Sequence, residues 1–262
     1  MVTPSDVVAD VRDQHYDVRG RIVHSLTFGQ HLTDTSPLVV ILPGLGLPFY
    51  TRPTARTVAA RGLKCAVLDL PGFGSRRPWP TRPTVHAIGM TAARWIELQA
   101  PHRPVLVLGH STGAQAALTA ALALSARRRD VALVMAGPTF TPGQRRLLRL
   151  AAAVPRAYRH DRPNEVDPAE LYRGRTGIVA MLHSGLHDAI EQRIPDLRLP
   201  LTLTAGVDDA FAPVAWLDLL ARSARQAPSV RTSLLNGSHN NLFTHPEEVA
   251  ELVVLAAADV AR

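Results

Sequence analysis

The segment Val105–Leu118 constrains this chain more than any other part of its sequence. It opens with the apolar run Val-Leu-Val-Leu, which predicts a buried strand. Gly-His-Ser-Thr-Gly follows at 109–113, and an alanine- and leucine-rich stretch that favours a helix comes directly after it. A strand, a G-x-S-x-G turn and a helix in this order predict a sharp reversal that exposes the hydroxyl of Ser111. Gly109 and Gly113 fit such a turn because they lack β-carbons that would collide across it.

Length and composition indicate a globular protein with a sizeable core. The chain has 262 residues, of which 46% are hydrophobic and 5% aromatic. Its formal net charge is +7, and Lys64 is the only lysine. The arginines are scattered and are not interleaved with aromatic side chains, so nucleic-acid binding is not expected.

Cysteine usage and the N-terminus bear on the compartment. The single cysteine, Cys65, lies in a predicted buried strand, so no disulfide is expected and a reducing compartment fits. Residues 1–6 lack the positive and apolar regions of a secretory signal. No apolar run approaches transmembrane length. We therefore predict a cytoplasmic protein that does not associate with membranes.

Short apolar strands alternate with helical patterns along most of the chain. This alternation predicts an α/β fold with a mostly parallel, doubly wound, eight-stranded sheet. The segments His15–Val18 and Arg21–Thr27 are expected to form an antiparallel pair at one edge. The other strands are predicted at 38–42, 63–68, 105–108, 131–135, 199–204 and 229–235, and helices at 52–61, 84–99, 112–127, 214–224 and 246–258.

The alternation stops between residues 138 and 198. Arginine- and alanine-rich helical pieces are punctuated there by prolines at 142, 155, 163, 168 and 195. Apolar clusters recur at helical spacing, in 147–150 and 178–182. Such a stretch is too long for a loop within a compact domain. We predict a helical cap at 138–198, inserted into a core formed by 1–137 and 199–262. Its apolar side chains are expected to pack together, and some of them to roof a pocket.

Ser111 needs a base to become a nucleophile, and the base needs an orienting acid. Both follow later strands: Asp208 and Asp209 come after the strand ending at 204, and His239 comes after the strand ending at 235. The carboxyl ends of parallel strands meet at one edge of a sheet. Ser111, His239 and one of the two aspartates are therefore expected to converge there.

Several motifs together resemble the α/β-hydrolase fold superfamily, from about residue 15 to the C-terminus. They are a glycine turn after the third strand, Asp-x-Pro-Gly-x-Gly after the fourth, G-H-S-x-G, G-x-x-D and G-S-H, at 43–46, 69–74, 109–113, 206–209 and 237–239. The chain departs from the family pattern at two places. Pro43 replaces the usual histidine, which removes any hydrogen bond by that side chain but not the backbone turn. The serine usual near the second turn is displaced to Ser75, which is expected to alter only a surface loop.

The resemblance implies roles for particular residues. Ser111 would be the nucleophile and His239 the general base and then acid. The family spacing of three after the glycine of G-x-x-D favours Asp209 as the orienting carboxylate, with Asp208 as the alternative. The backbone N–H groups of Leu45 and Thr112 would form the oxyanion hole.

The remaining histidines are given structural roles. His183 and His187 are spaced i, i+4, but Ser184 stands where the zinc-protease pattern has glutamate, so no metal site is expected. His110 is expected to pack beneath the serine turn.

The family resemblance implies a serine hydrolase that cleaves a small carboxylic ester or thioester through an acyl-enzyme, without a cofactor. A carbon–carbon bond hydrolase is one alternative, although such enzymes usually carry G-N-S-x-G-G where this chain has His110 and Ala114. A cofactor-free perhydrolase would use the same three residues. A non-catalytic ligand receptor on the same fold is the alternative from a different class.

Overall fold

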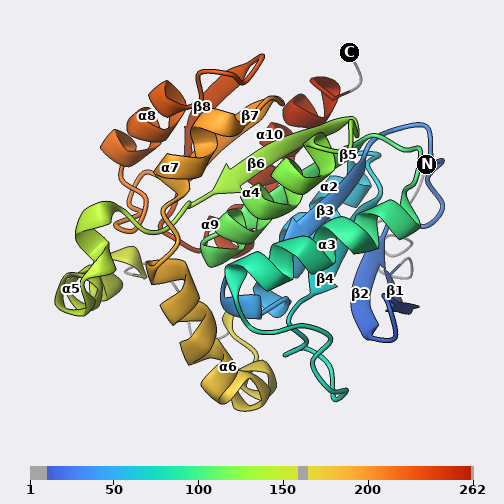
Figure 1. Cartoon of the computed structure of the whole chain (residues 1–262), viewed down its shortest axis with the longest axis horizontal. Helices are drawn as coiled ribbons and strands as arrows, with labels where there is room; N and C mark the ends of the chain where they lie inside the picture. The colour runs from blue at the N-terminus through green and yellow to red at the C-terminus, as the bar shows by residue number, and fades with distance from the viewer. Residues whose placement is uncertain (1–10, 159–164, 261–262) are drawn as a thin grey trace.

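The computed structural model describes residues 11–158 and 165–260, so the N-terminal residues 1–6 considered above lie outside the described part. One eight-stranded sheet runs through the molecule in the order β1-β2-β4-β3-β5-β6-β7-β8 (Figure 1). β1 pairs antiparallel with β2, β2 pairs antiparallel with β4, and all other pairs are parallel. The strands are β1 Val11–Asp17, β2 Ile22–Phe28, β3 Leu38–Leu42, β4 Cys65–Asp69, β5 Val105–His110, β6 Val131–Ala136, β7 Leu201–Gly206 and β8 Val230–Leu235.

Helices cover both faces of the sheet, as predicted. One face packs against α3 (Val85–Gln99), α4 (Thr112–Ser125) and α8 (Val214–Ser223). The other face packs against α2 (Arg52–Ala60) and α10 (Pro246–Ala258). The five strands from β3 to β7 are buried along their whole lengths, which is why they read as continuous apolar runs in the sequence. The predicted α/β fold is confirmed.

The N-terminal edge strand is longer than predicted. β1 begins at Val11, whereas the sequence pattern indicated a start at His15. Its first residues are mostly polar and exposed, so no hydrophobic alternation marks them. The backbone pairing from Val11 opposite Phe28 to Asp17 opposite Ile22 defines this strand instead.

A helical insertion connects β6 to β7. It contains η3 (Pro142–Arg145), α5 (Leu147–Ala157), α6 (Pro168–Leu186), α7 (Ile190–Arg193) and η5 (Ile194–Asp196). Three of its prolines stand in the first turn of η3, α6 and η5, where a missing N–H costs nothing. Pro163 lies outside the described residues.

Two expectations about the insertion were wrong. Pro155 does not separate helical pieces but lies inside α5, near its end. A residue with an N–H at position 155 would donate a hydrogen bond to the carbonyl of Ala151. Ala151 is exposed, so water can hydrate this carbonyl instead. Leu148 and Val179 do not pack inward, since 88% and 66% of their surfaces are exposed.

The insertion rests on the carboxyl-end loops of the core. The Phe49 N–H in η2 (Phe49–Thr51) donates to Glu170 of α6 at 3.2 Å. The Arg173 guanidinium donates to the carbonyl of Phe73, in the loop after β4, at 2.5 Å. Gln115 of α4 donates to the carbonyl of Gly185 at 2.8 Å. In Figure 1, α5 and α6 of the insertion accordingly project from one end of the sheet. None of the described helices has the length and hydropathy to cross a membrane.

Candidate active site

Ser111 lies at the junction of β5 and α4 in a strained backbone conformation, with φ 57° and ψ −127°. The turn requires its two glycines. A β-carbon on Gly109 would lie 2.3 Å from the carbonyl oxygen of Gly113, and one on Gly113 would lie 2.2 Å from that of Leu42. The predicted sharp turn is therefore present, and it leaves the Ser111 hydroxyl free to meet groups from later loops.

Ser111, His239 and Asp209 lie in one line of hydrogen bonds. His239 Nε2 is 2.9 Å from Ser111 Oγ, and His239 Nδ1 is 2.8 Å from Asp209 Oδ2. Because an ionised carboxylate only accepts, Nδ1 carries the imidazole proton and Nε2 is left to accept the serine proton. The three residues are 8%, 2% and 4% exposed, so the line is shielded from solvent.

The structure brings Asp209, not Asp208, against His239. The second carboxylate oxygen of Asp209 accepts the N–H of Phe211 at 2.8 Å and the N–H of Ala212 at 3.2 Å. Burial by itself raises the pKa of Asp209, but the His239 imidazole and these hydrogen bonds outweigh it and hold the pKa below its ordinary value. Asp208 is exposed.

The backbone of His239 is held on both sides. Its N–H donates to the carbonyl of Ala157, the last residue of α5, at 2.9 Å. Its own carbonyl accepts from His110 Nε2 at 2.8 Å. The rings of Tyr158 and Phe211 meet the imidazole edge-on, with centroids 5.7 and 4.9 Å away. The insertion therefore contributes directly to the orientation of His239.

The two expected oxyanion donors differ in their surroundings. Thr112 is the first residue of α4, so its N–H has no acceptor within the helix. Leu45 lies in η1 (Gly44–Gly46) with φ 50°, and its N–H donates to the Thr112 hydroxyl at 2.8 Å. For the Leu45 N–H to bind an oxyanion, the Thr112 hydroxyl has to give up this bond.

Comparison with protein families agrees with this geometry. The family described as "Alpha/beta hydrolase family" matches residues 39–252, which span the sheet from β3, the serine turn and the loops that carry Asp209 and His239. The chain belongs to the alpha/beta hydrolase family. No match was found among curated protein sequences.

Solved structures of similar fold include several hydrolases. An esterase from Thermogutta terrifontis is 17% identical with a TM-score of 0.71, over 95% of this chain and 99% of the esterase. An enol-lactonase from Burkholderia xenovorans LB400 is 17% identical with a TM-score of 0.70, over 94% of this chain and 100% of the lactonase. A thioesterase domain from the curacin biosynthetic pathway is 17% identical with a TM-score of 0.61, over 93% of this chain and 99% of that domain.

Two acidic side chains of the insertion lie buried beside the loops of this hydrolase. Glu165 accepts the side-chain N–H of Asn240, the residue after His239, at 2.5 Å. Glu170 accepts the Phe49 N–H through one oxygen, while its other oxygen is buried without a hydrogen bond to the described residues. Burial raises the pKa of Glu170 to about 7. Neither residue belongs to a motif, so no sequence signal could have selected them.

His183 and His187 lie next to each other, and no third metal-ligating side chain joins them among the described residues. Their rings are 4.2 Å apart, and His187 Nδ1 contacts the carbonyl of His183 at 2.8 Å. Within 11–158 and 165–260, no group of three or more histidine, cysteine or acidic side chains could hold a metal ion.

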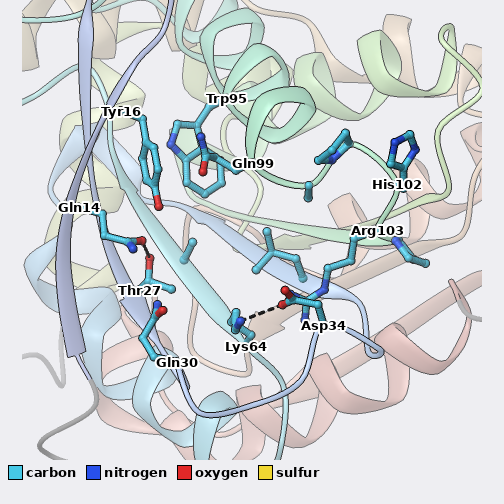
Figure 2. A pocket seen from close by; sticks show the side chains of 15 residues that line it. Gln14, Tyr16, Thr27, Gln30, Asp34, Lys64, Trp95, Gln99, His102 and Arg103 are labelled. Atoms are coloured by element: carbon cyan, nitrogen blue, oxygen red, sulfur yellow. Dashed lines mark hydrogen bonds and ion pairs between the residues drawn. The ribbon is translucent and has the colours of Figure 1, made fainter.

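A separate pocket lies at the opposite end of the sheet (Figure 2). It includes Leu38, the first residue of β3, and Lys64 and Pro104, which directly precede β4 and β5. Tyr16 lines one wall, and Lys64 pairs with Asp34 at 2.8 Å. The pocket contains none of the residues around Ser111, which lie at the carboxyl ends of the strands.

Proposed function

We propose that this alpha/beta hydrolase cleaves carboxylic esters or thioesters through an acyl-enzyme formed on Ser111. The observation that carries the proposal is the buried line from Ser111 Oγ through the His239 imidazole to the Asp209 carboxylate, with spacings of 2.9 and 2.8 Å. Nucleophile, base and orienting acid are thus within hydrogen-bond reach before a substrate binds.

In the acylation step, Ser111 Oγ attacks the carbonyl carbon of the substrate while its proton passes to His239 Nε2. Asp209 keeps the imidazole in the required tautomer and stabilises the imidazolium. The N–H groups of Thr112 and Leu45 donate hydrogen bonds to the negatively charged oxygen that was the carbonyl oxygen. The carbon–oxygen or carbon–sulfur bond then breaks, and the leaving group takes the proton from His239.

In the deacylation step, a water molecule replaces the leaving group as nucleophile. His239 accepts one proton of this water while its oxygen attacks the acyl carbon. The bond to Ser111 Oγ then breaks, the serine recovers its proton from His239, and a carboxylic acid leaves. The cycle consumes one water and needs no redox partner.

The insertion at 138–198 is proposed to act as a cap over this site. Its contacts with the core support the proposal, because Ala157 and Tyr158 reach His239 and Glu170 reaches the loop after β3. The esterase, lactonase and thioesterase of similar fold support ester-like compounds as the substrate class. A cap with these contacts would select the acyl or leaving group.

A panel of substrates tests the proposal. We expect turnover of at least one member among p-nitrophenyl esters and acyl thioesters of graded chain length. Ser111→Ala should reduce kcat on that member by about 10⁶-fold, to background, because the nucleophile is lost. A Ser111→Ala variant that keeps the wild-type rate would refute the proposed role of Ser111. Lack of turnover across the panel would refute the substrate class.

A further inference from the structure

A buried chain of hydrogen bonds runs beneath Ser111. The Gly44 N–H lies 2.6 Å from the Tyr50 hydroxyl, and that hydroxyl lies 2.6 Å from His110 Nδ1. His110 Nε2 lies 2.8 Å from the carbonyl oxygen of His239. Tyr50 is 8% exposed and His110 is 2% exposed. The chain therefore joins the turn after β3 to the loop that carries His239, through the residue directly before Ser111.

The directions of the two terminal bonds in this hydrogen-bond chain are fixed by its backbone ends, and that of the middle bond follows from the protonation of His110. A backbone N–H only donates, so the Tyr50 oxygen accepts from Gly44. A carbonyl only accepts, so His110 Nε2 carries a proton and donates it in a hydrogen bond to the backbone carbonyl of His239. In a neutral His110, Nδ1 is then unprotonated and accepts the single proton of the Tyr50 hydroxyl.

The surroundings hold His110 in that neutral state. Burial, together with the positive charge that His239 can carry 4.8 Å away, lowers the pKa of His110 to about 3. Burial also raises the pKa of Tyr50, so its hydroxyl keeps its proton. Both groups therefore keep the same protonation throughout the pH range in which a histidine base works.

The two ends of the chain are the parts that the proposed reaction needs in register. Gly44 precedes Leu45, one of the proposed oxyanion donors, and the space beside Gly44 is tight: a β-carbon there would lie 2.8 Å from Ser111 Cβ and 3.0 Å from the Tyr50 hydroxyl. His239 is the proposed base. Pro43 contributes no N–H and no polar side chain to this turn, so the polar contact comes from Tyr50, seven residues later in the sequence.

We infer that Tyr50 and His110 are positioning residues that hold the oxyanion turn and the His239 loop in register around Ser111. The inference rests on the proposed function, since it concerns the geometry of that same reaction. Neither side chain exchanges a proton with the substrate. Their effect reaches the reacting atoms through the backbones of Gly44 and His239.

The test compares variants that differ by one polar atom. Tyr50→Phe removes only the hydroxyl and should lower kcat about 10- to 100-fold, as small misplacements of reacting groups do, with KM within about threefold of wild type. Tyr16→Phe is the matched control, because its hydroxyl lines the pocket at the opposite end of the sheet (Figure 2), and it should leave kcat unchanged.

Variants of His110 test whether the two residues act as one unit. His110→Gln can retain a donor toward the His239 carbonyl and should lose less activity than His110→Leu. The double variant Tyr50→Phe/His110→Gln should be no slower than the slower single variant, since each substitution already breaks the same chain. Losses that multiply, or a Tyr50→Phe variant whose kcat is within twofold of wild type, would overturn the inference while leaving the proposed function intact.

A second measurement needs no turnover. ¹⁵N NMR of the imidazole nitrogens should show His110 with a protonated Nε2 and an unprotonated Nδ1 in the wild-type protein. Tyr50→Phe should shift the signals of the His110 ring and also those of the His239 ring, because the loop moves. His239 signals that stay at their wild-type positions in this variant would overturn the inference even if the protein hydrolysed no ester.

Discussion

At the scale of single residues, the site depends on which group faces which nitrogen of His239. Asp209 holds Nδ1 with one carboxylate oxygen and is itself held by two backbone N–H groups through the other. Gly137 leaves space for this pair, since a β-carbon there would lie 3.0 Å from the Asp209 carboxylate. The tautomer of the His239 imidazole is therefore set by Asp209 in the loop after β7, and Gly137 after β6 leaves room for the pair.

Asp209→Asn tests this arrangement. The amide can donate to Nδ1, which favours the tautomer with a proton on Nε2 and removes the acceptor for the serine proton. We expect kcat to fall on the order of 10³- to 10⁴-fold with the fold retained. Asp208→Asn is the matched control at the exposed neighbour and should stay close to wild type. The assignment is wrong if Asp208→Asn is the more damaging change in steady-state assays.

The sequence could place Ser111, Asp209 and His239 at one site because each occurs in a motif at the end of a strand, and the structure brings the three side chains together. The family spacing favoured Asp209 but kept Asp208 as an alternative, since only the turn after β7 decides which carboxylate points inward. Tyr50, Glu165 and Glu170 were not identified, because their partners lie far away in the sequence and no spacing rule connects them.

At the scale of elements, α6 contacts the core through the buried side chain of Glu170. Glu170 accepts the Phe49 N–H from η2, and it faces Asp69 as well as Arg52 and Asp167. Burial is the largest cause of its raised pKa, and the neighbouring carboxylates add to it. Ionisation of Glu170 therefore destabilises the packing of α6 against the core.

The sign of the resulting pH dependence follows from the two states. In the unfolded chain Glu170 loses its proton near its ordinary pKa of 4.5, whereas in the folded protein it does so near 7. Between these values the folded state binds the extra proton, so Glu170 lowers the free energy of unfolding as pH rises. Glu170→Gln keeps an acceptor for the Phe49 N–H and cannot ionise.

We expect Glu170→Gln to gain stability relative to wild type between pH 5 and pH 8, by about 2–3 kcal/mol at most. Denaturant unfolding at the two pH values measures this difference. Glu251→Gln, an exposed glutamate on α10, is the matched control and should show no such gain. A Glu170→Gln variant that follows the wild-type pH dependence would contradict a buried, proton-binding Glu170.

At the scale of the whole molecule, the sheet brings the three proposed catalytic residues together at one edge. Ser111 follows β5, Asp209 follows β7 and His239 follows β8, and the insertion between β6 and β7 contacts loops at the same edge. The alternation of apolar strands and helices predicted the sheet, and the motifs at the strand ends predicted that Ser111, Asp209 and His239 converge. The internal course of the insertion was less predictable, because its helices follow contacts with the core: α5 continues through Pro155 and leaves Leu148 exposed.

The central claim is that Ser111 is a nucleophile activated by His239, and covalent labelling tests it most directly. A fluorophosphonate probe is incubated with folded wild-type protein, and the labelled peptide is identified by mass spectrometry. We predict one adduct on Ser111, formed much more slowly in His239→Ala. Labelling that leaves Ser111 unmodified, or that proceeds equally fast without His239, would contradict the account.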